Sequence, residues 1–325
     1  MTLPFVGTAE GQPNPYSHPG RTLRGLRHHA HKSLASGFCY VNDCVLALLV
    51  LRRASPSPPL SSNPGNLRKK SRVMYLDLDV HYGDGVAAAF RGAGARGQVL
   101  TLSVHHAALG FFPASEHSAL PDISSDAFDP FTLALPLHAG ASCATFTRVW
   151  RTVDRILEAF APDYIVLQCG VDGLAEDPVG AWNWALDGEG GLAWWVQRVL
   201  DFSAKVLLLG GGIVLTRPRN SHVFDVLPRW VYSCQHRPCV GAAYLYCGAS
   251  VARVAYSCSR LFGQCGVPLA PDTPIPNHAG FPMYAPSFIL DVPASNVRDE
   301  NTDEYLTKVD ATFEDVAKIL RTLLA

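Results

Sequence analysis

Two aspartates and a histidine occupy alternate positions of an apolar segment at residues 75–85, YLDLDVHYGDG. Side chains alternate between the two faces of an extended strand, so Asp77, Asp79 and His81 would share one face. Two buried carboxylates cannot both stay ionised without a compensating cation. A third carboxylate, Asp172, follows the apolar residues 165–171. One imidazole and carboxylates with open positions for water and substrate are typical of catalytic zinc, so these residues predict a metal centre.

A purely structural interpretation of the same residues stays open. Asp77 could cap loop amides, and His81 could be a core histidine with hydrogen-bonded nitrogens, as most buried polar groups are. For one such residue that interpretation is as good as a metal site. Three together, followed by Gly-Asp-Gly, favour the metal because unpaired carboxylates are rarely buried.

Adjacent histidines, His28 and His29, precede a segment with helical apolar spacing. Tandem histidines are often surface residues without a role in chemistry. Two imidazoles beside a metal-bound water could instead act as general base and general acid, because their pKa values lie near neutrality. Each would need a carboxylate to orient it, and Asp77 and Asp84 are the available candidates.

A framework of strands and helices must bring these distant residues together. Short apolar runs at 72–80, 98–106, 163–171 and 204–212 each end in Gly, His or Asp. Helical spacing occurs at 145–160, and an earlier helix is expected to end near Arg53. Strands alternating with helices predict a single α/β domain with three layers, α/β/α, and a mainly parallel sheet. Ligands bind at the carboxyl ends of such strands, where the polar residues lie.

The composition narrows the classes of partner. The 325 residues are 48% hydrophobic and carry a net charge of −1, so a large core is possible and no direct nucleic-acid partner is expected. The first residues do not resemble a signal peptide, and no run of about 18 apolar residues appears, so no membrane contact is expected. Nine cysteines without a C-x-x-C pair are typical of a reducing, intracellular compartment.

Two segments are expected to stay outside the packed core. Residues 1–24 are rich in Gly and Pro and predict a flexible lead, which leaves 25–325 as the folded domain. Residues 54–71 are rich in Pro, Ser and basic residues and cannot bury enough apolar surface to order themselves. They predict a disordered insertion between a helix and a strand.

Five motifs resemble, in this order, the zinc-dependent histone deacetylases, class I members in particular: HHAHKSLASGFCYVND, YLDLDVHYGDGVAAAF, TLSVHHAALGFFP, IVLQCGVDGLAEDPVG and LLLGGG. The similarity runs from about residue 25 to residue 212 and returns more weakly at 278–302. It implies the arginase/deacetylase fold. Arginases share Asp-x-Asp-x-His, but they hold two manganese ions and lack the first motif, so an arginase is a remote alternative.

The activity that the resemblance implies is zinc-dependent hydrolysis of N-acetyl-lysine in proteins. Acetylated histones or other protein lysines would be the substrates, and corepressor-complex subunits are candidate partners. The implied role is chromatin repression, and the implied location is the nucleus, with the cytoplasm as a further possibility.

The resemblance also assigns roles to the residues singled out above. Zinc would be held by Asp79, His81 and Asp172. His28 and His29 would handle the protons, with Asp77 backing His28 and Asp84 backing His29.

Two further sets of residues receive roles only from the resemblance. A narrow channel around the lysine stem would be lined by Gly37, Phe38 and Phe112. A potassium ion would be bound by carbonyls and side chains of Asp77, Asp79, His81, Ser103 and Val104.

The chain departs from the family pattern after LLLGGG. The family continues with Gly-Tyr and uses that tyrosine hydroxyl to hydrogen-bond the developing oxyanion, whereas Ile213 and Val214 stand here. Residues 213–265 show no resemblance; they are either a divergent segment that returns a tyrosine such as Tyr232, or translated non-coding sequence. The N-terminus is shorter than the family's, and Tyr82 replaces a second histidine.

Losing one oxyanion donor typically costs about 100- to 1,000-fold in turnover. Two hypotheses therefore stand. The protein is a lysine deacetylase with impaired activity, or it is a deacetylase-like pseudo-enzyme that acts as a zinc-binding acetyl-lysine reader or as a subunit of a complex.

Overall fold

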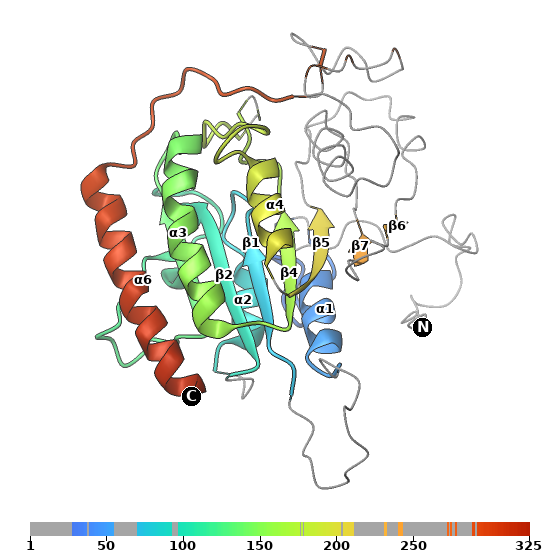
Figure 1. Cartoon of the computed structure of the whole chain (residues 1–325), viewed down its shortest axis with the longest axis vertical. Helices are drawn as coiled ribbons and strands as arrows, with labels where there is room; N and C mark the ends of the chain where they lie inside the picture. The colour runs from blue at the N-terminus through green and yellow to red at the C-terminus, as the bar shows by residue number, and fades with distance from the viewer. Residues whose placement is uncertain are drawn as a thin grey trace, which may run out of the picture.

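The computed structural model contains one central sheet, which is mainly parallel (Figure 1). It describes residues 28–37, 39–54, 70–92, 97–175, 177, 179–202, 204–210, 231–232, 240–242, 272, 274, 277, 288–289 and 291–325. Within them the strand order is β3-β2-β1-β4-β5-β7-β6, and only the β6–β7 pair is antiparallel. The strands are β1 (Val73–Asp77), β2 (Val99–His106), β3 (Thr132–Leu137), β4 (Tyr164–Cys169), β5 (Lys205–Gly210), β6 (Val231–Tyr232) and β7 (Val240–Ala242).

Helices cover both faces of this sheet (Figure 1). One face carries α3 and α4, with α6 packed beside α3; the other face carries α1 and α2. The helices are α1 (Asp43–Leu51), α2 (Asp84–Phe90), α3 (Cys143–Phe160), α4 (Leu192–Asp201) and α6 (Asp303–Leu324), with a short 3-10 helix, η1 (Glu116–Ser118). The predicted three-layer α/β/α architecture with a mainly parallel sheet is confirmed.

Burial on both faces explains why the strands are nearly continuous apolar runs. In β1, Met74 and Leu76 face the main core beneath α3 and α4. Val73 and Tyr75 face the opposite core, where they pack with Leu48 of α1. By the same alternation, Asp77 lies on the face of Tyr75, which is the face covered by α1 and α2.

The elements differ from the sequence prediction at β1, β3 and α1. The ladder of β1 ends at Asp77 instead of continuing to residue 80, although Leu78 and Val80 stay buried in the main core. The strand β3 was not predicted, because its sequence TLALPL contains Pro136. Proline is tolerated there because β3 lies at the edge of the sheet. The helix expected to end near Arg53 is α1, which ends at Leu51.

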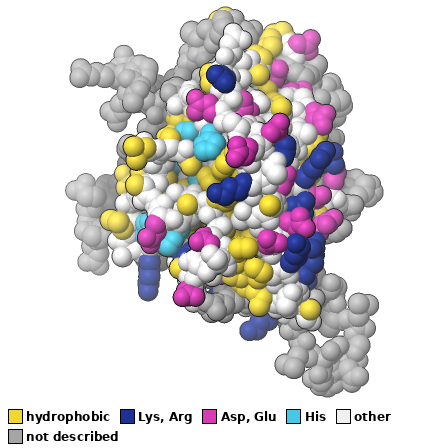
Figure 2. Space-filling view, turned by 90° about the vertical axis from the view of Figure 1, so that its left-hand side faces the viewer, with side chains coloured by type: hydrophobic (Ala, Val, Ile, Leu, Met, Phe, Trp, Pro, Cys, Tyr) yellow, Lys and Arg dark blue, Asp and Glu magenta, His cyan; other side chains and the backbone are white. Residues whose placement is uncertain are grey.

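Several predicted segments lie outside the described residues. These are the lead at 1–24, nearly all of the insertion at 54–71, and the segment 213–265 apart from the backbone of β6 and β7. None of the described helices is both long enough and apolar enough to span a membrane. On the face that carries α6, acidic and basic side chains are interspersed (Figure 2).

Candidate metal and acid-base site

The candidate site lies at the carboxyl ends of β1 and β4, as expected for a parallel sheet. These two strands are neighbours, with Asp77 paired to Gln168 at their ends. The chain beyond β4 passes very close to the chain beyond β1. A β-carbon at Gly170 would lie 2.4 Å from the Cα of Asp79. Glycine at position 170 therefore lets the loop that carries Asp172 reach Asp79.

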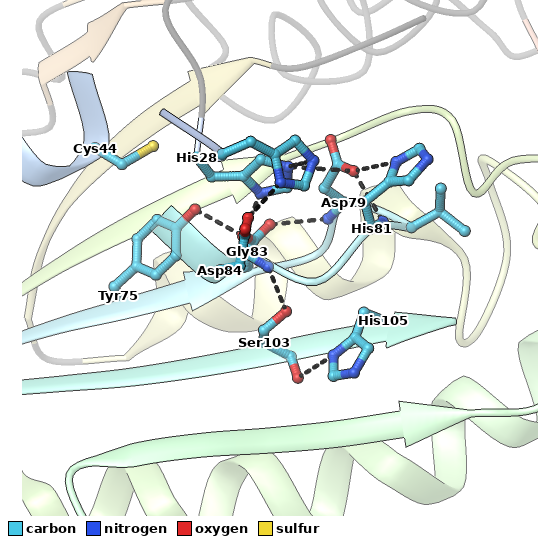
Figure 3. A network of polar contacts seen from close by, with 12 residues as sticks. His28, Cys44, Tyr75, Asp79, His81, Gly83, Asp84, Ser103 and His105 are labelled. Atoms are coloured by element: carbon cyan, nitrogen blue, oxygen red, sulfur yellow. Dashed lines mark hydrogen bonds and ion pairs between the residues drawn. The ribbon is translucent and has the colours of Figure 1, made fainter. Parts of the chain in front are cut away.

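Asp79, His81 and Asp172 bring one ligand atom each to within 4.8 Å of one another. His81 Nδ1 lies 3.1 Å from Asp79 Oδ1, an approach visible in Figure 3, and 3.0 Å from Asp172 Oδ2. Backbone amides fix both carboxylates: Asp79 accepts from the His81 N–H at 3.0 Å, and Asp172 from the Val80 N–H at 3.1 Å. The three residues that the sequence predicted as ligands thus converge.

The two carboxylates of this group attract positive charge, which a protonated His81 supplies here and which a bound cation would replace as His81 loses its proton. Burial, reinforced by repulsion from Asp79, raises the pKa of Asp172. Burial acts on Asp79 in the same direction, but the neighbouring His28 and His81 outweigh it and lower the pKa of Asp79. Burial lowers the pKa of His81, yet its hydrogen bonds to the two carboxylates raise it to about 10. One imidazole nitrogen and two oriented carboxylates are a donor set suited to zinc, and the described residues fit that ion.

Next to this group lies His28 (Figure 3). Its imidazole is hydrogen-bonded to that of His29. His28 Nδ1 lies 2.6 Å from Asp77 Oδ2, and His29 Nδ1 lies 2.7 Å from Asp84 Oδ1. Burial raises the pKa of Asp77, against the opposing effect of His28. When both carboxylates are ionised they can only accept, and both Nδ1 atoms then carry protons. The two Nε2 atoms lie 2.9 Å apart and must share one proton between them. The pair therefore carries a single positive charge.

The local electrostatics put that charge on His28. Burial lowers the pKa of His28, but the carboxylates of Asp77 and Asp79 outweigh it and raise the pKa to about 9. Burial and the neighbouring positive His28 lower the pKa of His29 to about 4, against the smaller opposing effect of Asp84. The pKa values of the two histidines are thus shifted in opposite directions because their surroundings differ.

Aromatic rings surround the exposed side of this site. Phe111 stacks on His81, with ring centroids 5.1 Å apart, and Phe112 meets His29 edge-on at 4.8 Å. Gly37 lies against the same rings, since a β-carbon there would be 2.7 Å from His29 Cδ2 and 2.8 Å from Phe112 Cε1. Two of the three predicted channel residues are thus beside the histidines. The third, Phe38, lies outside the described residues.

Two of the residues expected to bind potassium, Ser103 and Val104, lie on β2 beside the end of β1. Ser103 of β2 pairs with Asp77 across the sheet, and its hydroxyl accepts a long 3.4 Å hydrogen bond from the Gly83 N–H. Val104 is the next residue of β2 and is buried. His105 at the end of β2 takes no part in the metal group; its two ring nitrogens contact carbonyl oxygens of Ser103 and Ser118.

Several supporting residues were missed by the sequence analysis. Asn42, the N-cap of α1, donates its side-chain amide to the carbonyl oxygens of His28 and Ala30. It thereby ties the histidine loop to the first helix. His31 Nε2 lies 3.2 Å from Asp84 Oδ2. An asparagine before a helical segment is a recognisable N-cap, but nothing in the sequence indicated that the Asn42 side chain also contacts the His28 loop.

Comparisons with known proteins agree with this geometry. A family model described as the histone deacetylase domain matches residues 20–221. Histone deacetylase 1 of Homo sapiens is 31% identical over 290 residues, which cover 88% of this chain and 47% of that protein. Histone deacetylase 9 of Arabidopsis thaliana is 31% identical over 288 residues, covering 88% of this chain and 53% of that protein. The chain spans about half the length of these relatives, and it belongs to the histone deacetylase family.

Proposed function

We propose that the protein is a zinc-dependent lysine deacetylase that hydrolyses N-acetyl-lysine in proteins, with histones as the first substrates to test. The observation that supports this most directly is the juxtaposition of two sets of residues. A convergent Asp-His-Asp group lies beside two imidazoles, each backed by its own carboxylate. A purely structural role for the histidines and aspartates would not require both sets at one place.

Asp79, His81 and Asp172 would hold the zinc ion. When bound, zinc would supply a Lewis acid that polarises the amide carbonyl and acidifies a water molecule. His29 is the member of the histidine pair with the lowered pKa; its Nε2 contacts His28 Nε2 here and would accept a proton from the attacking water once that hydrogen bond is released. His28 is positively charged, so it would stabilise negative charge and supply a proton to the leaving amine.

The aromatic rings at the mouth suit the aliphatic part of an acetyl-lysine side chain. Phe112 is 43% exposed and lies against His29, so it would form one wall of a channel together with Gly37. We also propose Phe38 as a wall. A potassium ion bound near Asp77 and Ser103, association with corepressor subunits and a nuclear location belong to the same proposal, and they rest on family membership alone.

A second candidate function follows from the sequence after β5. Val214 stands where the family has its oxyanion-binding tyrosine, and this position lies outside the described residues. With the metal group and histidines intact but that donor missing, the protein would bind acetyl-lysine without hydrolysing it efficiently. It would then act as an acetyl-lysine reader or as a subunit of a complex.

One experiment separates these two functions. The full chain is loaded with zinc and mixed with a fluorescent acetyl-lysine histone peptide, and both fluorescence anisotropy and acetate release are measured. A deacetylase gives zinc-dependent acetate release, whereas a reader gives binding without release. The unacetylated peptide is the control for both signals. If neither binding nor release depends on the acetyl group, both functions are excluded.

A further inference from the structure

Tyr75 contacts the proposed acid-base machinery from inside the core. We propose that Tyr75 is a positioning residue, which holds His28 in its working orientation through a hydrogen bond to Asp77. This inference rests on the proposed function, because it assigns Tyr75 a part in the same site. It concerns a residue that touches neither the metal group nor the histidines.

Asp77 accepts hydrogen bonds at both of its carboxylate oxygens. Its Oδ2 accepts from the Tyr75 hydroxyl at 2.7 Å and from His28 Nδ1 at 2.6 Å. Its Oδ1 accepts from the Asp79 N–H at 3.1 Å. Asp77 is fully buried, so water cannot replace a lost donor. Three donors from different directions thus fix the carboxylate plane, and one of them is the Tyr75 hydroxyl.

The core, and not the site, fixes the position of this hydroxyl. The Tyr75 side chain is 1% exposed. It packs in the core opposite to the main one, with Cys44 and Leu48 of α1 and Val86 of α2. In Figure 3 the ring lies beneath α1, with its hydroxyl pointing toward His28 and with Cys44 nearby. Because two helices clamp the ring, the hydroxyl is a preorganised donor that needs no rearrangement during a reaction.

Alternation along β1 explains why a tyrosine can do this. Tyr75 and Asp77 are two residues apart, so both side chains leave the strand on the same face. That face is covered by α1 and α2, and the loop of His28 lies against the start of α2 through the Val86 N–H bond to the His28 carbonyl. The orientation of Asp77 therefore sets the plane of the His28 ring and the position of its Nε2 beside His29.

Tyr75→Phe is the direct test, because it removes the hydroxyl and keeps the ring in the core. Tyr82→Phe is the matched control: Tyr82 is also buried, 2% exposed, and its hydroxyl has no partner within the described residues. Acetate release is measured with zinc-loaded full chain. We expect Tyr75→Phe to lower kcat by about 10- to 100-fold, the range for a hydrogen bond to a charged group, with KM and bound zinc unchanged. Tyr82→Phe should leave kcat unchanged.

A loss of packing would also lower activity, so two further readouts are included. Tyr75→Phe combined with His28→Ala should be no slower than His28→Ala alone, because Tyr75 acts through that histidine. The proton NMR resonance of the His28 Nδ1–H should shift in Tyr75→Phe and stay in place in Tyr82→Phe. Should Tyr75→Phe not fold, 3-fluorotyrosine at position 75, a stronger donor of similar size, should also move this resonance.

The outcomes are distinguishable. If Tyr75→Phe has the kcat and the His28 resonance of the unmodified chain, the positioning role is refuted. An equal loss with and without His28 would likewise refute it and leave Tyr75 as a core residue. If the unmodified chain releases no acetate, the proposed function fails, and the NMR comparison alone then decides the role of Tyr75.

Discussion

Asp299 caps the helix α3, whose N-cap residue lies 157 residues away along the chain, and we expect its replacement to destabilise the protein. The N-cap residue of α3, Ser142, makes no capping bond with its own side chain. Asp299 Oδ2 instead accepts hydrogen bonds from the Ser142 N–H at 2.9 Å, the Ser142 hydroxyl at 2.7 Å and the Thr145 hydroxyl at 2.6 Å. Asp299 Oδ1 accepts two more from Asn301, which in turn accepts from the His138 N–H.

The expected loss of stability follows from these contacts. Removing a helix N-cap costs about 0.5–2 kcal/mol, and a carboxylate at a helix N-terminus contributes about 0.3–1 kcal/mol more. The segment that leads to α6 would also lose its anchor on α3, so we expect Asp299→Ala to lower the free energy of unfolding by about 2–4 kcal/mol. Asp303→Ala is the control, because Asp303 is 95% exposed and its ion pair with Arg148 should contribute little.

The pH dependence of this effect has a definite sign. Burial would raise the pKa of Asp299, but hydrogen bonds from Thr145, Asn301 and Ser142 outweigh it and lower the pKa. A lowered pKa in the folded state stabilises the protein above the unfolded-state value of about 3.9, and this stabilisation is lost as the pH falls further. Urea denaturation at pH 7 and near pH 3 is the assay. Equal stability of Asp299→Ala and Asp303→Ala at pH 7, or a difference between them that is as large near pH 3 as at pH 7, would refute the reasoning.

Two further predictions concern the site. Gly83 has an ordinary φ of −73°, but a β-carbon there would lie 2.5 Å from Asp77 Oδ2, so Gly83→Ala should displace this carboxylate. We expect turnover to fall by about 10- to 100-fold with zinc binding retained; unchanged turnover would contradict the importance of Asp77. Residues 213–265 contain four tyrosines, any one of which could supply the oxyanion donor in place of the family's tyrosine. If one of them does, its replacement by phenylalanine should lower kcat by about 100- to 1,000-fold. If none of the four Tyr→Phe variants has a lowered kcat, a tyrosine donor from this segment is excluded. The four tyrosines are Tyr232, Tyr244, Tyr246 and Tyr256.

The strands that carry the site were predictable because local patterns determine them. The apolar runs that end in polar residues predicted β1, β2, β4 and β5, and alternation predicted one shared face for Asp77, Asp79 and His81. The strand β3 was not predicted. It contains Pro136, and a proline argues against a strand unless that strand is known to lie at the edge of the sheet. Edge position is a property of the assembled sheet and is not encoded by local periodicity.

Some contacts of the site were predicted from the sequence and others were missed. The pairing of His28 with Asp77 and of His29 with Asp84 was expected from the resemblance, and both pairs are in hydrogen-bond contact. Tyr75 was missed because a tyrosine in an apolar strand is by default a core residue. Asp299 was missed because it caps a helix 157 residues away along the chain. Such contacts depend on how the chain folds back on itself, which local patterns do not specify.

The central claim about this protein is that a single metal centre at Asp79, His81 and Asp172 is required for deacetylation. The most direct test is to add zinc stepwise to the metal-free full chain and to measure, in the same samples, bound zinc and the initial rate of acetate release from an acetyl-lysine peptide. We predict that the rate rises in proportion to bound zinc and stops rising at about one zinc per chain, and that Asp172→Ala neither binds this zinc nor releases acetate. Release that is independent of zinc, or zinc binding that is undiminished in Asp172→Ala, would contradict the account.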